Sequence, residues 1–244
     1  MEEVDGILVA AYELKSPLAT LRQLALSFDD LGSEGEKIRA EMVAVSERAI
    51  RQVNDLAKIR RLSEGLFEME PVAVRGICDE VTREVLGLFE EGRSEGQAAR
   101  ARLKIKYSNR SRLVTANREL LSSVVYNFLT SATHYAELTN EAAGDGAGFS
   151  ELSVSERRGF VRVEVRDFGP ALPRDVWREM RSGFVERPTS IAMRPGTSGL
   201  GLYIASKFAK YMSARVGAVR HRDGTSFYVE LPVSKQTSFF EAGV

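Results

Sequence analysis

The feature that most constrains this chain is a heptad pattern of apolar residues near its start. The apolar positions, which alternate steps of three and four, are Val4, Ile7, Ala11, Leu14, Leu18, Leu21, Ala25 and Phe28. A seam of about four heptads predicts a long helix that packs against other helices. The pattern stops at DDLGSEG, where Ser33 followed by Glu36 forms a capping-box signal for a second helix.

The second helix carries its own apolar seam. Its members are Ile38, Met42, Val45, Ala49, Leu56 and Ile59. A two-helix hairpin on its own leaves much of this apolar surface in water, whereas a second copy completes a four-helix bundle. We therefore expect residues 1–66 to form a hairpin that makes a homodimer, with Gly65 and Pro71 marking a hinge after it.

Beyond the hinge the pattern alternates between helices and strands. Helices are expected at 74–89, 117–136 and 198–212, and strands at 103–108, 149–156, 159–167, 214–221 and 224–232. This order predicts helices layered on one face of a mainly antiparallel or mixed sheet. The expected domain covers residues 67–236, and residues 237–244 form a C-terminal tail.

Composition excludes several classes of protein. Lys plus Arg equals Asp plus Glu at 34 each, so the basic excess of a general nucleic-acid binder is missing. One cysteine, Cys78, excludes an intrachain disulfide, and two histidines argue against a histidine-rich metal centre. No apolar run approaches the ~20 residues of a membrane span. The start, MEEVDGILVA, lacks the features of a signal peptide, so we expect a cytoplasmic location.

A glycine-rich segment, GTSGLGLYIASKFAKYM, opens one of the predicted helices. Gly196, Gly199 and Gly201 lie just before and within its first turn. Glycines let the backbone approach an anion, and a helix start supplies N–H donors and a favourable dipole. The segment is not a Walker loop, because no lysine follows the last glycine. An ordinary glycine-rich helix cap is the alternative.

Two further segments carry candidate ligand groups. In VEVRDFGPALP a strand ends at Asp167, whose carboxylate can accept a hydrogen bond from an exocyclic amine, while Gly169 leaves room for a flat ring. In NRELLSSVVYNFLTSATHYA a polar line of Asn127, Ser131 and Tyr135 recurs at steps of four and faces either a ligand or solvent. The predicted buried face of this helix consists of Leu120, Leu121, Val124, Val125, Phe128, Leu129 and Ala132.

In this order, after a two-helix hairpin, these segments resemble the catalytic core of a bacterial sensor histidine kinase. NFLTSATHYA resembles the N box of the family, RDFGPALP its first glycine box, Phe184 its F box and GTSGLGLYIA its second glycine box. ELKSPL resembles the phosphoacceptor segment, and LAKIRRLSEGLFEMEPV the exit from the hairpin. The implied fold is α+β: an antiparallel two-helix hairpin forming a dimeric four-helix bundle, followed by an α/β sandwich ATP-binding domain of Bergerat (GHKL) type.

The resemblance also implies roles for single residues in binding ATP. Asp167 would hold the adenine amino group, Gly169 would leave space beside the base, and Tyr135 would stack on it. Asn127 would lie at the metal-phosphate end with Mg²⁺, next to Ser131. The implied phosphate contacts lie at Thr197, Ser198, Gly199, Leu200 and Gly201, and residues 187–197 would form a short lid.

This sequence departs from the family pattern at four positions. Tyr12 stands where the family has its phosphoacceptor histidine, beside Glu13 as the adjacent acid, and Ser131 stands where a magnesium-binding asparagine is common. Ala171 replaces a glycine, and His134 replaces a lysine or arginine. Pro17 lacks an N–H and bends the helix beside Tyr12. A phenol has a pKa of about 10, so the phenolate needed for attack on a phosphate is scarce near neutral pH.

These residues predict a histidine-kinase-like two-component signalling protein that binds ATP and is impaired in autophosphorylation. Its expected partners are a second copy of the chain and, near Tyr12, a response-regulator receiver domain or another kinase. Three alternatives stay open at this point. They are an active kinase or ATPase, a response-regulator phosphatase in which Ser16 positions the attacking water, and a purely structural dimer module.

Overall fold

The computed structural model describes residues 18–26, 32–90, 102–108, 112–143, 149–169, 171–174, 177–178, 180 and 199–235. The chain divides into two compact units, one made of 1–66 with 84–100 and the other of 67–83 with 101–244. The expected division into a hairpin at 1–66, a domain at 67–236 and a tail at 237–244 stays a prediction. None of the helices in the described ranges is long and apolar enough to cross a membrane.

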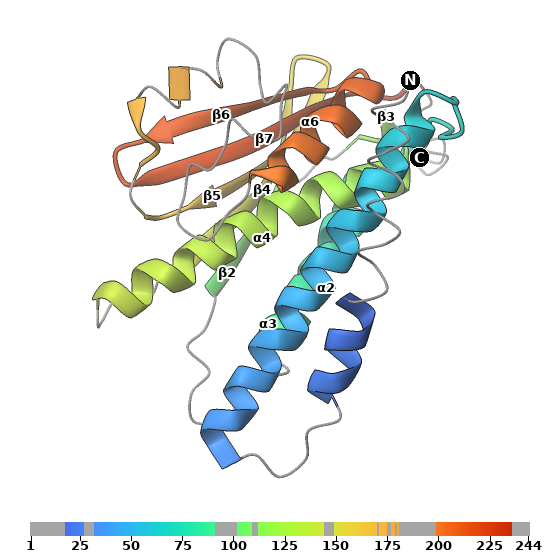
Figure 1. Cartoon of the computed structure of the whole chain (residues 1–244). Coiled ribbons are helices and arrows are strands. Elements are labelled where there is room, and N and C mark those ends of the chain that lie inside the picture. Colours follow the sequence, from blue (N-terminus) through green and yellow to red (C-terminus); the bar gives the residue numbers. More distant parts are fainter. Residues whose placement is uncertain are drawn as a thin grey trace, which may run out of the picture. The chain divides into compact units, whose positions relative to one another are not determined.

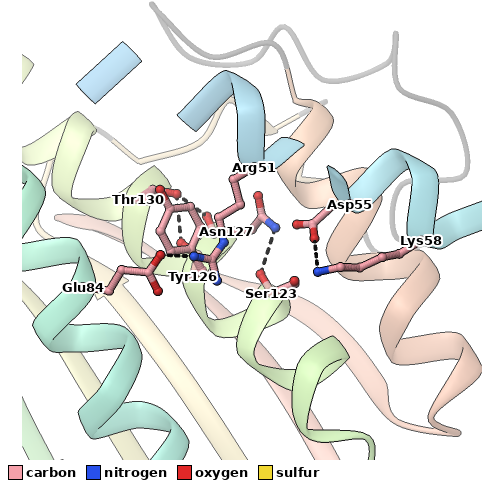
Figure 2. A network of polar contacts seen from close by, with 8 residues as sticks. All are labelled: Arg51, Asp55, Lys58, Glu84, Ser123, Tyr126, Asn127 and Thr130. Atoms are coloured by element: carbon pink, nitrogen blue, oxygen red, sulfur yellow. Dashed lines mark hydrogen bonds and ion pairs between the residues drawn. The ribbon is translucent and has the colours of Figure 1, made fainter. Parts of the chain in front are cut away.

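The first unit contains the hairpin helices. Residues 18–26 are helical, and the long helix α2 (Gly32–Leu62) begins one residue before the predicted cap at Ser33. Arg22 forms an ion pair with Glu47 at 2.8 Å, which joins the first helical segment to α2. Figure 2 shows two further ion pairs of this unit, Arg51 with Glu84 and Lys58 with Asp55.

Three of the six side chains in the apolar seam predicted for α2 are exposed in the single chain, and the other three are half-buried. Ile38, Met42 and Val45 are 55%, 37% and 52% exposed. Among the α2 residues whose burial the structure describes, Val43, Ser46, Val53 and Asp55 are buried. The side chains that a packed bundle would hide are therefore still open to solvent in one copy.

The second unit is built on a mixed five-stranded sheet, as the sequence predicts. Its order is β2 (Arg102–Tyr107), β4 (Phe149–Arg157), β5 (Phe160–Asp167), β7 (Gly224–Pro232) and β6 (Arg215–His221). Strand β2 runs parallel to β4, and the other neighbours are antiparallel.

A small second sheet lies where the sequence suggested a hinge. Strand β1 (Glu70–Val72) pairs with β3 (Val114–Ala116), and both consist of three residues. Pro71 therefore lies inside a short strand that borders the linker, a position where a missing N–H is tolerated. Gly65, with φ +68°, lies in the turn after α2.

Helices α4 (Arg118–Ala143) and α6 (Leu200–Tyr211) cover one face of the five-stranded sheet (Figure 1). The side chain of Asn117 caps α4, because its Oδ1 accepts a hydrogen bond from Leu120 N at 3.1 Å. All seven residues predicted as the buried face of α4 are buried, and Phe128 among them stacks on Phe227 of β7 at 6.0 Å.

Helix α3 (Val74–Glu90) contributes its first half to the second unit and follows the predicted range closely. Tyr107 of β2 donates a hydrogen bond to Asp79 at 2.5 Å, and Arg75 lies over the Tyr107 ring. Cys78 is fully buried, and burial together with the Asp79 charge raises its pKa to about 12. The thiol is therefore protonated and unreactive near neutral pH.

The segment that leaves the hairpin is fixed to helices α4 and α6 of the second unit. Tyr211, the last residue of α6, donates from its hydroxyl to the carbonyl of Phe67 at 3.2 Å and meets the Phe67 ring edge to face. Asn117 Nδ2 donates to the carbonyl of Glu68 at 2.9 Å. Residues 67 and 68 are thus held by the end of α6 and the start of α4.

Candidate functional site

Asp167 ends β5 on the face that the helices cover. Residues alternate along β5, and Asp167 is fully buried in line with Val161, Val163 and Val165. Its Oδ1 accepts a hydrogen bond from Thr225 N at 3.1 Å. The carboxylate is therefore held in one orientation by a backbone donor of the neighbouring strand.

Gly224 permits the close approach of β7 to Asp167. It has φ +142°, and a Cβ at this position would lie 2.0 Å from the Asp167 carbonyl oxygen. A side chain at position 224 would force the two backbones apart. The glycine and the threonine that follows it in GTSFYVELP thus set the position of the carboxylate.

The loop after β5 is attached to the sheet by two hydrogen bonds. Leu172 N donates to Thr225 Oγ1 at 3.4 Å, and Arg220 Nε donates to the Leu172 carbonyl at 2.7 Å. Gly169 and Ala171, between Asp167 and this anchor, are half-buried. The first glycine box is therefore held against β7 and β6 beside Asp167.

Asn127 of α4 is buried, with 5% of its surface exposed. Its Nδ2 donates to the carbonyl of Ser123 at 2.8 Å, as Figure 2 shows. Its Oδ1 faces the first turn of α6, because a Cβ on Gly201 would lie 2.6 Å from this oxygen. Asn127 and Gly201 are 74 positions apart in the sequence. The structure thus brings together two residues that the sequence analysis assigned to one site.

The start of α6 has a backbone conformation that is typical of anion-binding helix starts. Gly199 caps the helix in the left-handed conformation, with φ +69° and no side-chain cap. The first hydrogen bond within the helix runs from Tyr203 N to Gly199 O at 3.2 Å. Leu200 and Gly201 in this turn are half-buried. A helix start of this kind offers amide donors and a positive dipole end to a phosphate.

Other predicted residues are placed only in part. Ser131 is half-buried on α4, one turn after Asn127, and Tyr135 lies on the same helix with its side chain outside the described residues. The remaining predicted residues lie wholly outside the described ranges. They are Tyr12, Glu13, Ser16, Pro17, Phe184, Thr197, Ser198 and the rest of the 187–197 segment.

The described residues contain no cluster of three or more His, Cys, Asp or Glu side chains that could enclose a metal ion. The carbonyl oxygen of Asn127 is nevertheless a ligand type that Mg²⁺ accepts. Because Mg²⁺ commonly binds through one or two protein ligands and substrate phosphates, this donor fits a nucleotide-borne ion. Tyr203, near the same helix start, has its pKa raised by burial, so its phenol is neutral.

Sequence reasoning missed three residues around Asp167. Gly224 and Thr225 belong to the predicted strand, and the Gly-Thr pair at its start was a signal that could have found them. Ser150 is the third: it pairs with Asp167 across β4 and β5 and is 2% exposed. Ser150 lies 17 positions before Asp167 in the sequence, so only the register of the two strands shows that the residues are neighbours.

Residues 116–235 match the family model described as histidine kinase-, DNA gyrase B-, and HSP90-like ATPase. The chain is 25% identical over 228 residues to the probable sensor histidine kinase TcrY of Mycobacterium tuberculosis, covering 92% of this chain and 44% of that protein. It is 28% identical over 242 residues to the histidine-protein kinase/phosphatase MprB of Mycolicibacterium paratuberculosis, covering 91% and 42%. The chain thus spans less than half the length of these two relatives.

Solved structures confirm the expected fold class. Full-length ShkA in complex with AMPPNP aligns with a TM-score of 0.61 at 20% identity, over 96% of this chain and 47% of that one. The Acinetobacter baumannii histidine kinase AdeS aligns with a TM-score of 0.55 at 13% identity, over 89% and 96%. At these identities the likeness concerns the fold alone.

The contact between α4 and α6 makes a prediction about stability. Gly201→Ala is expected to lower the free energy of unfolding by about 1–3 kcal/mol, because its Cβ would overlap Asn127 Oδ1. In an Asn127→Ala background the same change should be nearly neutral, since the overlapping carboxamide is gone. Urea unfolding of the four variants measures this coupling. Equal costs in the two backgrounds would show that the two residues do not meet.

Proposed function

We propose that this chain binds ATP, because residues 116–235 match the model of the histidine kinase-, DNA gyrase B-, and HSP90-like ATPases and the chain is similar to sensor histidine kinases. The observation that carries the proposal is the buried carboxylate of Asp167, fixed by Thr225 N at the helix-covered face of the sheet. A buried carboxylate needs donors, and an exocyclic amino group supplies one.

The base and the phosphates would use different elements. At the base end, Asp167 accepts a hydrogen bond from the adenine amino group, Gly169 leaves room for the ring, and Tyr135 stacks on it. At the phosphate end, the backbone of residues 197–201 donates to phosphate oxygens, and Asn127 Oδ1 holds the metal. Bound Mg²⁺ would neutralise phosphate charge there.

Replacing the carboxylate tests this site. Asp167→Asn is expected to weaken ADP binding at least tenfold, because a charge-assisted hydrogen bond is worth about 1.5–3 kcal/mol. Isothermal titration calorimetry with and without Mg²⁺ measures the affinity. Glu80→Gln, an exposed carboxylate on α3, is the matched control and should bind as the wild type does. Unchanged affinity in Asp167→Asn would place the base elsewhere.

We propose further that transfer of the γ-phosphate within this chain is impaired. The phenol of Tyr12 supplies little phenolate near neutral pH, and its phosphate ester would be a poor donor to a receiver aspartate. Ser131 has a shorter side chain than the asparagine of the resembling family, so it reaches a metal ion less well. Binding at Asp167 depends on neither residue.

Labelling with γ-³²P-ATP and Mg²⁺ tests this impairment. The wild type is expected to acquire no acid-labile phosphate, because it lacks an imidazole at position 12. Tyr12→His restores the nucleophile, and Tyr12→His with Ser131→Asn restores both groups, so label should rise in that order. Acid-labile label on the unmodified chain would refute the impairment while leaving ATP binding intact.

The proposed role is signalling by nucleotide occupancy in a cytoplasmic two-component system. Helix α6 begins at the phosphate end of the site and ends at Tyr211, which holds Phe67 next to the boundary between the two units. Occupancy that favours one arrangement of the units by about 2 kcal/mol would change its ratio to the other roughly thirtyfold. A response-regulator receiver or another kinase would dock near Tyr12 and Glu13.

The chain would act as a homodimer through its hairpin. Support comes from the exposed apolar side chains on α2, and from Leu21 and Leu24 of the preceding helical segment, which are 47% and 53% exposed. A second hairpin would bury these side chains in a four-helix bundle. Exposed apolar side chains that gather on one helix face are typical of an interaction surface.

A charge in this row should break the dimer. Val45→Glu is expected to shift the mass measured by size-exclusion chromatography with light scattering from dimer to monomer, because the buried carboxylate would lack a partner. Glu36→Lys, on the exposed surface of the same helix, is the control and should stay dimeric. A dimeric Val45→Glu would move the interface off this face.

A further inference from the structure

A row of three buried polar side chains crosses the sheet at the base end of the proposed site. Ser150 of β4 pairs with Asp167 of β5, and Asp167 pairs with Thr225 of β7. Cross-strand partners point to the same face of a sheet, which here is the face that α4 and α6 cover. Their exposed fractions are 2%, 0% and 0%. The Asp167 carboxylate therefore lies between two hydroxyl-bearing neighbours.

The two hydroxyls differ in their hydrogen bonds. Thr225 Oγ1 accepts from Leu172 N, and the Thr225 amide donates to Asp167. Ser150 Oγ is buried and has no hydrogen-bond partner in the described part of the chain. Nearly all buried polar groups in proteins are paired, so an orphaned hydroxyl beside a ligand-binding carboxylate indicates a missing partner.

The chemistry of adenine supplies such a partner. Its reading edge presents an amino group, which donates, directly beside the ring nitrogen N1, which accepts. An ionised carboxylate only accepts, so Asp167 satisfies the amino group and leaves N1 without a donor. A serine hydroxyl both donates and accepts. The Ser150 hydroxyl makes no hydrogen bond in the described part of the chain, whereas that of Thr225 already accepts one from Leu172 N.

We propose that Ser150 is a base-specificity residue whose hydroxyl donates a hydrogen bond to N1 of the purine, directly or through one bound water. This inference rests on the proposed ATP binding at Asp167. Together the two side chains read the donor and the acceptor of the adenine edge. Guanine presents the reverse order, an N1–H donor beside an oxygen acceptor, and would match this pair poorly.

The test compares ADP with 1-deaza-ADP, in which a C–H group replaces N1, by calorimetry on the full chain. The wild type should bind ADP about five- to tenfold more tightly than the analogue. Ser150→Ala should lose about that factor for ADP and less than twofold for the analogue, because the analogue has no acceptor to lose. Ser150→Thr keeps a hydroxyl and should retain a preference for ADP.

Ser153→Ala is the matched control, because Ser153 lies on the same strand but faces the other side of the sheet, opposite Glu164. It should bind both nucleotides as the wild type does. Ser150→Ala should melt no lower than the wild type, since it removes an unpaired hydroxyl.

Two results would overturn the inference. An equal loss for both nucleotides in Ser150→Ala would mean that the hydroxyl only shapes the site, and an unchanged ADP affinity would mean that it holds an internal water at most. Both results leave ATP binding at Asp167 standing. A wild-type chain that binds neither nucleotide would overturn the proposed function and the inference together.

Discussion

The close approach of α6 to α4 is the constraint on which the site depends. Asn127 Oδ1 occupies the space that a Cβ of residue 201 would need, so the helices reach this spacing only with a glycine there. Gly199, two residues earlier, has a different task, because its φ of +69° is a conformation that favours glycine. The repeated glycines of this helix start thus have two physical causes, packing against α4 and the turn into the helix.

A glycine also sets the spacing at Asp167, at the end of β5. Asp167 would be a costly buried charge without donors, and the Thr225 amide of the adjacent strand supplies one. That amide reaches the carboxylate because Gly224 has no side chain to hold β7 away from the Asp167 backbone. Burial, register and a glycine together place one carboxylate in a fixed orientation, which is what recognition of a single amino group requires.

Long periodic elements could be predicted from the sequence, and contacts between them could not. The buried face of α4 follows from a period of 3.6 residues, and β5 follows from strict alternation. The strands β1 and β3 have three residues each, too few for a period, so the sequence around Pro71 indicates a hinge rather than a strand. The pairing of β5 with β7 and the parallel β2–β4 pair depend on tertiary packing, and so does the position of Ser150 beside Asp167.

The candidate site also contains residues that the sequence predicts and residues that only the tertiary structure reveals. Asp167, Gly199, Gly201 and Asn127 carried recognisable local signals, and the structure describes all four in one unit. The apolar seam of α2 is also recognisable, and its first half, with Ile38, Met42 and Val45, is exposed in the single chain. Val53, which fits the same spacing between Ala49 and Leu56, is buried. Exposed apolar side chains on such a seam are what a helix would hide in an assembled bundle.

Binding and transfer would depend on separate residues in this chain. In the proposed site, Asp167, Gly224 and Thr225 would serve the base, the start of α6 and Asn127 would serve the phosphates, and Tyr12 would be needed only when phosphate moves. The substitutions proposed to impair transfer would therefore leave the binding elements in place. Helix α6 has both ends in use, one at the proposed phosphates and one at Phe67 through Tyr211. A nucleotide that orders the start of α6 would change the free energy of the arrangement of the two units that the Tyr211 end favours. Such a change would be sufficient for regulation without phosphate transfer.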